Sequence, residues 1–240
     1  MESGGDVICI DLPTEPNTDI FVEISKTTGQ KWSYHSLDVT DSIAVQKTID
    51  DEISNLRPSH PLRGVVTTAG ISGGAPAETY PLDKFKQILD INVLGTFNVV
   101  QAVGRYMLEN KLGGSVVMIA SMSGSVANKG VKTAAYNTSK SAILQLARSL
   151  AAEWGNPSPS TTSPAPPIRV NSLSPGYIHT ALSEESMNHP ETREVWLSGS
   201  MLGRFSWAEE YRGPVLFLLG EASRFMTGAD LRVDGGHCAW

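Results

Sequence analysis

Cysteine is scarce in this 240-residue chain: only Cys9 and Cys238 are present, too few for a scaffold built on disulfides. Cys9 lies in a strand-like apolar run, where we expect a buried and inert thiol. Long apolar runs are also missing, since none approaches the roughly 18 residues that a membrane span needs. The first residues lack the basic and apolar parts of a signal peptide. Together these absences favour a reduced, cytoplasmic protein.

Basic residues are fewer than acidic ones: the chain has 19 Lys and Arg and 25 Asp and Glu, which gives a net charge of −6 and a pI near 5.4. This balance argues against a nucleic-acid partner and against an anionic membrane surface. The five histidines have no metal-ligand spacing, so the sequence predicts no metal site. They are His35, His60, His179, His189 and His237.

The composition that remains is ordinary for a globular protein, with 40% hydrophobic and 18% charged residues. Helical patterns fill the gaps between six strand-like runs, which predicts one α/β domain over residues 1–240, with a parallel sheet covered by helices on both faces. The expected strands are Val7–Leu12, Trp32–Leu37, Gly64–Thr68, Val116–Ala120, Ile168–Leu173 and Asp230–Val233. The expected helices include Ser42–Asn55 after an Asp41 cap, Leu82–Leu108 and Ala134–Trp154. Residues 156–167 hold five Pro among Ser and Thr and predict a solvated loop insertion without a function of its own.

Tyr136 and Lys140 are four residues apart on a predicted helix and therefore share one face. The strand before that helix ends in Ser121-Met122-Ser123-Gly124, which places hydroxyl groups at its carboxyl end. Open α/β sheets bind ligands at that end of their strands. A phenol with an amine beside it is suited to proton transfer, so this pair is the candidate catalytic centre.

Several short motifs in order along the chain resemble the short-chain dehydrogenase/reductase family. They are Asp90-Ile91-Asn92-Val93, Ser121-x-x-Gly124, Tyr136-x-x-x-Lys140, Arg169-Val170-Asn171-Ser172, Pro175-Gly176, Thr227-Gly228-Ala229-Asp230 and Val233-Asp234-Gly235-Gly236. The resemblance implies a Rossmann-like doubly wound sheet and hydride transfer between NAD(P) and a ketone or secondary alcohol. Finer details such as Ser121-Met122-Ser123 and Met201-Leu202-Gly203-Arg204 resemble fungal polyol dehydrogenases and ketose reductases of that family.

The resemblance also implies catalytic roles. Tyr136 would be the general acid and base, and an ammonium on Lys140 would lower the pKa of the phenol. Ser121 would hold the substrate oxygen; Ser123 is the alternative, because its thirteen-residue distance from Tyr136 matches many relatives. Asn92 would lead protons to Lys140, or it would only disturb a long helix.

Cofactor contacts are expected from both halves of the chain. Asp11 ends the first strand, where a carboxylate accepts both ribose hydroxyls and repels a 2′-phosphate, so NAD is favoured over NADP. Asp38 would bond the adenine, or it would cap a helix. Ala69 and Gly70 follow Thr67-Thr68, which stand where the family has two asparagines. Lys140, Tyr136 and Asn92 would line the nicotinamide side, and Ile178 and Thr180 would contact the carboxamide.

The family's first strand and its Gly-x-x-x-Gly-x-Gly turn have no counterpart before Val7. We therefore expect the chain to fold poorly and to bind NAD poorly, unless Val7–Asp11 pairs directly with Gly64–Thr68. The substrate would be a small carbonyl or alcohol bound by residues 177–206, and a homodimer or homotetramer is expected. Two alternatives stay open: a ketoreductase of fungal secondary metabolism, and an inactive truncated member that serves as a partner subunit.

Overall fold

The computed structural model describes residues 1–15, 18–156 and 165–240. Most of the predicted insertion over 156–167 therefore lies outside the described residues. The six predicted strands are present as β1 (Val7–Asp11), β2 (Trp32–Ser36), β3 (Gly64–Thr67), β4 (Gly114–Ile119), β5 (Ile168–Pro175) and β6 (Asp230–Val233). The helices are α1 (Asp19–Thr28), α2 (Ser42–Ser54), α3 (Leu82–Leu89), α4 (Thr96–Glu109), α5 (Ala134–Trp154), α6 (Ala181–Asn188), α7 (Pro190–Gly199) and α8 (Arg212–Leu219).

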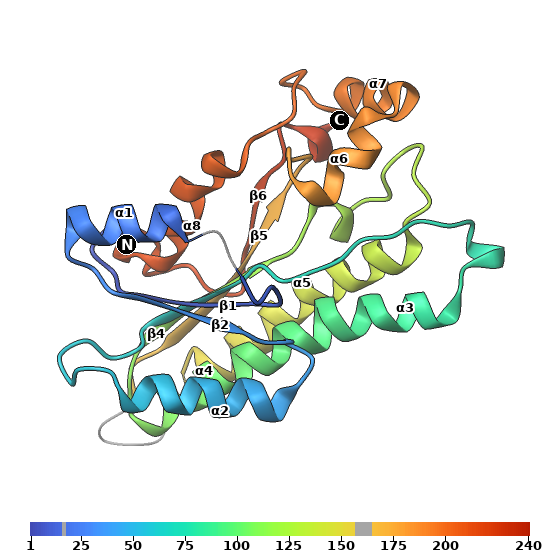
Figure 1. The fold of residues 1–240 in the computed structure, drawn as a ribbon. Helices are drawn as coiled ribbons and strands as arrows, with labels where there is room; N and C mark the ends of the chain where they lie inside the picture. Colours follow the sequence, from blue (N-terminus) through green and yellow to red (C-terminus); the bar gives the residue numbers. More distant parts are fainter. Residues whose placement is uncertain (16–17, 157–164) are drawn as a thin grey trace.

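All the described strand pairs are parallel, as the alternation of strands and helices predicted. The larger sheet has the order β3-β4-β5-β6 and is built on β-branched residues in register, with Val65 opposite Val116 and Val116 opposite Val170. Helices α2, α4 and α5 cover one face, and α8 covers the other (Figure 1). The α/β fold class is thus confirmed.

The strands β1 and β2 form a separate two-stranded sheet. No pairing joins β1 to β3 within the described strands, so direct closure of Val7–Asp11 onto Gly64–Thr68 does not occur. Side-chain contacts hold the small sheet instead. Ile10 packs against the main core cluster, and the Asn98 Nδ2 group of α4 donates to the Val39 carbonyl at 2.9 Å.

The predicted continuous helix Leu82–Leu108 is wrong in one respect, because a π-helical turn over Asp90–Gly95 separates α3 from α4. Asn92 lies inside this turn and directs its amide to Ile71 and Ser139, away from the helix. Gly95 is required there, since a Cβ atom would approach Val39 Cγ2 to 2.6 Å. Such π-helical turns are common at functional sites.

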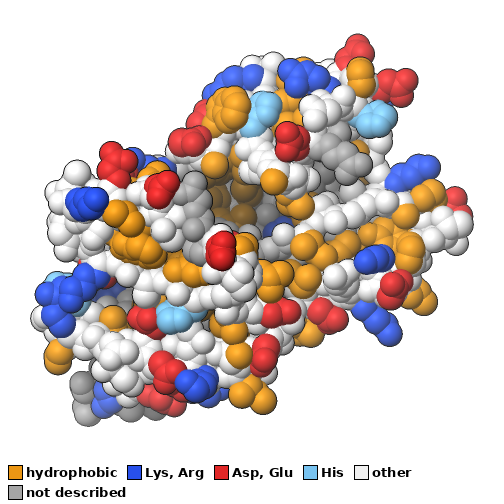
Figure 2. Space-filling model, viewed as in Figure 1, with side chains coloured by type: hydrophobic (Ala, Val, Ile, Leu, Met, Phe, Trp, Pro, Cys, Tyr) orange, Lys and Arg blue, Asp and Glu red, His pale blue; other side chains and the backbone are white. Residues whose placement is uncertain are grey.

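The main core fills the space between the larger sheet and helices α2, α4 and α5. Val116, Met107 and Ile143 are fully buried in it. A second core lies under α8 around Val117, Leu173 and Leu218. None of the helices in the described ranges is long and apolar enough to cross a membrane. Figure 2 shows a hollow near the centre of the molecule, below the lobe that carries α6 and α7.

Candidate active site

Two serines follow β4, and they have different partners. The backbone N–H of Ser123 donates to Ser121 Oγ at 3.1 Å, so Ser121 caps a short helical turn. The Ser121 hydroxyl also lies close enough to the Tyr136 phenol to lower the pKa of that phenol. In contrast, Ser123 Oγ accepts a 2.6 Å hydrogen bond from Asn128 Nδ2. Ser121 is therefore in contact with the phenol, while Ser123 is directed toward the following loop.

Helix α5 places Tyr136 and Lys140 one turn apart against the end of β4. The Lys140 side chain is only 6% exposed. Its Nζ donates to the Ile119 carbonyl at 2.9 Å and lies 5.7 Å from the centre of the Tyr136 ring. The helix and the strand end thus bring together the two residues that the sequence put forward as a pair.

Burial dominates the protonation of both groups. It lowers the pKa of Lys140 to about 8, since an ammonium group is poorly stabilised away from water. It raises the pKa of Tyr136 as well, and the nearby Ser121 hydroxyl only partly opposes this rise. The expected lowering of the phenol pKa by Lys140 is not found. The reason is that Nζ points to a backbone carbonyl while desolvation penalises the phenolate.

Asn92 connects the π-helical turn to the catalytic helix. Its Oδ1 accepts from the Ile71 N–H at 2.8 Å, and its Nδ2 donates to the Ile71 carbonyl and to Ser139 Oγ, both at 2.9 Å. Gly70 lies over the same group, because a Cβ atom there would stand 3.2 Å from Asn92 Oδ1 and 3.7 Å from Lys140 Nζ. Asn92, Gly70 and Lys140 therefore form one cluster, so Asn92 does more than disturb a helix.

The remaining predicted cofactor residues lie at strand ends. Asp11 is exposed at the end of β1, and its Oδ1 accepts from the Leu12 N–H at 2.7 Å. Asp38 does not cap α2; it accepts from Thr40, and Asp41 is the cap, as predicted. Ala69 is exposed just after β3.

Ile178 and Thr180 follow β5 at the start of α6. The Ser183 hydroxyl donates to the Ile178 carbonyl and lies 3.3 Å from Thr180 Oγ1. The structure thus groups them near the end of β5, whereas Asp11 ends one strand of the separate small sheet and Asp38 follows its other strand.

The two threonines in place of asparagines have a local consequence. The Thr67 hydroxyl is buried, and it makes no hydrogen bond to any described residue. Thr67 therefore adds no side-chain hydrogen bond to the sheet among the described residues.

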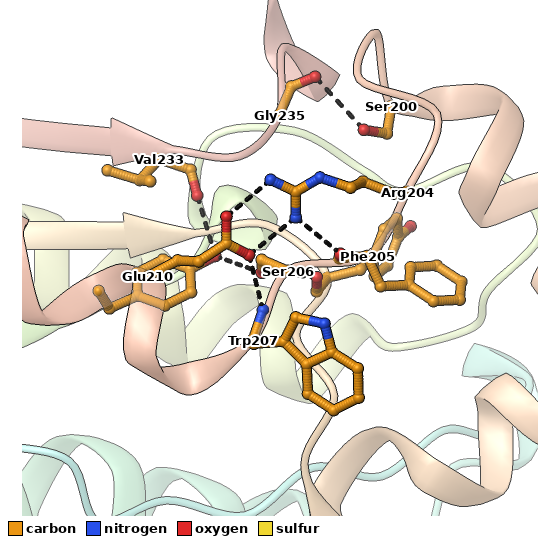
Figure 3. Close-up of polar contacts among 10 residues, drawn as sticks. Ser200, Arg204, Phe205, Ser206, Trp207, Glu210, Val233 and Gly235 are labelled. Atoms are coloured by element: carbon orange, nitrogen blue, oxygen red, sulfur yellow. Dashed lines mark hydrogen bonds and ion pairs between the residues drawn. The ribbon is translucent and has the colours of Figure 1, made fainter.

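An ion pair that the sequence did not predict lies at the C-terminal end of residues 177–206 (Figure 3). The Arg204 guanidinium bonds both Glu210 oxygens, at 2.8 and 2.6 Å, and the Trp207 N–H donates to the same carboxylate at 2.9 Å. These bonds lower the pKa of Glu210 to about 2. Ser206 Oγ donates to the Tyr177 carbonyl at 2.9 Å. The two ends of the segment are therefore joined to each other.

Aromatic side chains pack residues 177–206 against the loop that precedes α5. Tyr177 stacks on Trp196 of α7, with ring centres 4.1 Å apart. Phe205 and Val131 pack into the same cluster, and Val131 belongs to the loop just before α5. Ser121, Ser123 and Asn128 are all less than a tenth exposed, whereas Ser125 and Lys129 of the same loop are exposed.

Comparison with known proteins identifies the class to which this fold and site belong. A family model described as "Enoyl-(Acyl carrier protein) reductase" matches residues 1–237. The chain is 50% identical over 243 residues to the short chain dehydrogenases/reductase notP' of Aspergillus versicolor. This alignment covers 100% of this chain and 81% of that protein. It is also 40% identical over 178 residues to a ribulose-forming D-arabinitol 2-dehydrogenase of Scheffersomyces stipitis. That alignment covers 73% of this chain and 61% of that enzyme.

A solved structure supports the same assignment. The crystal structure of gox2181 superposes with a TM-score of 0.85 at 31% identity, over 100% of each chain. The chain therefore belongs to the short-chain dehydrogenase/reductase family, as its motifs predicted. Members of this family are oxidoreductases that act on CH–OH groups with NAD or NADP.

Proposed function

We propose that the chain interconverts a ketone and a secondary alcohol with Tyr136 as general acid and base. The observation that carries this proposal is the buried Lys140, whose Nζ lies 5.7 Å from the centre of the Tyr136 ring, with the buried Ser121 hydroxyl close to the same phenol. The three groups come from α5 and the end of β4, so rigid elements position them. The resulting cluster has a proton donor, a second hydroxyl and a cation within one small volume.

The reduction needs a proton at the oxygen where negative charge develops. Tyr136 is fully protonated at neutral pH, because burial raises its pKa, and it is therefore ready to donate that proton. Ser121 donates a hydrogen bond to the same oxygen and holds it in place. Lys140 stabilises the phenolate left behind, and it keeps most of its charge below its pKa of about 8. Oxidation of an alcohol runs these steps in reverse and needs the phenolate at the start.

The nicotinamide half of NAD(P) fits the residues around Lys140. Gly70 leaves the Asn92 and Lys140 side chains open to close approach, since any Cβ there would meet both groups. Lys140 would bond the ribose, and Ile178 and Thr180 would hold the carboxamide. The bound cofactor would supply or accept the hydride. Asp11 would accept the adenosine ribose hydroxyls, which favours NAD, and Asp38 would lie toward the adenine.

The proposed substrate is a ketose or its polyol. This choice is supported by the similarity to an arabinitol dehydrogenase and by the hydrogen-bonded polar pair Ser123 and Asn128 next to Ser121. Residues 177–206 would form the cover of the substrate site. We further propose a homodimer or homotetramer through α4 and α5; a clean monomer in sedimentation at micromolar concentration would contradict it.

The test is turnover of ketoses with NADH or NADPH, followed by nicotinamide absorbance. Tyr136→Phe should reduce kcat by several orders of magnitude, because it removes the acid and its hydrogen bond together. The melting temperature should stay close to that of the parent, which separates chemistry from folding. Turnover of the variant within about tenfold of the parent, a change of roughly 1.4 kcal/mol, would refute the role of Tyr136.

A further inference from the structure

Asn128 is a buried amide beside the candidate catalytic serines. It lies in the loop between the turn that Ser121 caps and helix α5. Its side chain is 8% exposed, and its Nδ2 donates to Ser123 Oγ at 2.6 Å. Ser123 in turn donates its backbone N–H to Ser121 Oγ. The amide is therefore two hydrogen-bonded steps from the hydroxyl proposed to hold the reacting oxygen.

Only one side of this amide is used. Asn128 Oδ1 is buried, yet it accepts no hydrogen bond from any residue that the structure describes. A carboxamide oxygen has two lone pairs, and buried acceptors in native proteins are nearly always satisfied. An asparagine that only braced the loop would be expected to use both its oxygen and its nitrogen. The unused acceptor therefore points to a donor that comes from a ligand.

The reaction itself does not require this pair. Reduction of a plain ketone uses Ser121, Tyr136 and Lys140, so Ser123 and Asn128 are polar groups beyond that need. A hydroxyl group on the substrate would suit this pair, because it is uncharged and can donate a hydrogen bond to Asn128 Oδ1. Asn128 is 8% exposed and Ser121 7%, so the two side chains are buried to the same extent.

We infer that Asn128, oriented by Ser123, binds a second hydroxyl group on the carbon next to the reacting carbonyl. The inference rests on the proposed function and names the residue that would recognise the hydroxyl next to the reacting carbon of its ketose or polyol substrate. Asn128 is then a residue that determines specificity, and Ser123 is a positioning residue. This also gives the second serine of Ser121-Met122-Ser123 a role distinct from that of the first.

The test compares hydroxyacetone with butanone, which differ by a hydroxyl in place of a methyl group. The parent should prefer hydroxyacetone. Asn128→Leu keeps the shape of the side chain and should lower kcat/KM for hydroxyacetone about tenfold, mainly through KM, since one neutral hydrogen bond is lost. The value for butanone should change less than about threefold. Equal losses on both ketones, or an unchanged preference, would overturn the inference.

Two further variants guard against a folding defect. Ser123→Ala with Asn128→Leu removes both polar partners and leaves neither unpaired, and it should show the same loss of preference with a melting temperature near that of the parent. Asn110→Leu removes an exposed amide at the end of α4, where Nδ2 donates to the Tyr106 carbonyl, and it should leave the preference unchanged.

A binding measurement separates this inference from the proposed function. With NADH present, xylitol should raise the melting temperature of the parent and of Asn110→Leu, and about tenfold more xylitol should be needed for the same rise in Asn128→Leu. If the parent reduces neither ketone but shows this pattern, the proposed reaction is wrong and the hydroxyl site stands. If xylitol protects Asn128→Leu as well as the parent, the hydroxyl site is wrong.

Discussion

Replacement of Lys140 with Met should remove activity and change stability in a pH-dependent way. Burial lowers the pKa of Lys140 from its ordinary value of 10.5 to about 8. Between these two values the unfolded chain binds more protons than the folded protein, so the stability of the parent rises with pH across that window. The difference corresponds to about 3 kcal/mol. Below pH 8 the parent carries this full cost of a buried ammonium group.

Met retains the length of the side chain and avoids that cost, but it leaves the Ile119 carbonyl without its donor. A buried acceptor without a partner costs about 1–3 kcal/mol. The variant should therefore equal the parent or exceed it by up to about 2 kcal/mol at pH 7, and should fall below it by about 1–3 kcal/mol near pH 10.5, where Lys140 is neutral.

Urea unfolding at several pH values between 7 and 10.5 measures this crossing, with Lys86→Met on the exposed side of α3 as the control. Titration of other groups cancels when each variant is compared with the parent. A stability difference for Lys140→Met that stays constant with pH would show that the folded protein does not bury a charged lysine here.

Three other predictions concern the reaction. In carbonyl reduction, kcat/KM should fall as pH rises above about 8, because Lys140 loses its charge, whereas alcohol oxidation should gain from higher pH because burial raises the pKa of Tyr136; parallel pH profiles would contradict this. Asp11→Ser should reduce the preference for NADH over NADPH by at least about tenfold in kcat/KM, since one carboxylate no longer repels the 2′-phosphate. Ser121→Ala should reduce kcat with every ketone, whereas Ser123→Ala should mainly raise KM for hydroxylated ones, and the reverse ranking would exchange their roles.

The sequence predicted those parts of the fold that depend on local pattern. All six strands were found, and in the larger sheet the reason is that apolar runs such as Val116–Ala120 are largely buried and bounded by glycine or polar residues. The end of α5 before Gly155 and the Asp41 cap of α2 follow from local chemistry as well. The π-helical turn at Asn92 could not be predicted, because its cause is a set of contacts with Ile71 and Ser139, which are distant in sequence.

In the candidate site, too, features set by local sequence were predictable, and features set by the folded environment were not. Tyr136 and Lys140 share a helix face by spacing alone, so their proximity was predictable. The raised pKa of Tyr136 was not, because it depends on how deeply the folded chain buries the ring. Asn128 gave no signal either: an asparagine in a loop is common, and only the structure shows that its oxygen lacks a partner among the described residues.

The two sheets divide the proposed cofactor site between them. Asp11 and Asp38 follow β1 and β2, whereas Ser121, Lys140 and Ile178 are positioned by the four-stranded sheet. Since no described strand pairing joins the two sheets, the amides of β1 and β2 should exchange hydrogen with water faster than those of β4 and β5. A dinucleotide bound to residues of both sheets would favour the arrangement in which the two sheets hold those residues at the correct separation. Because a ligand that binds only the folded state stabilises that state, the small sheet should be stabilised by the cofactor. NADH should therefore slow exchange in β1 and β2 more than in β4 and β5, while AMP, which lacks the nicotinamide, should not protect the residues around Lys140. Equal protection of both sheets by NADH, or none in β1 and β2, would show that the small sheet takes no part in cofactor binding.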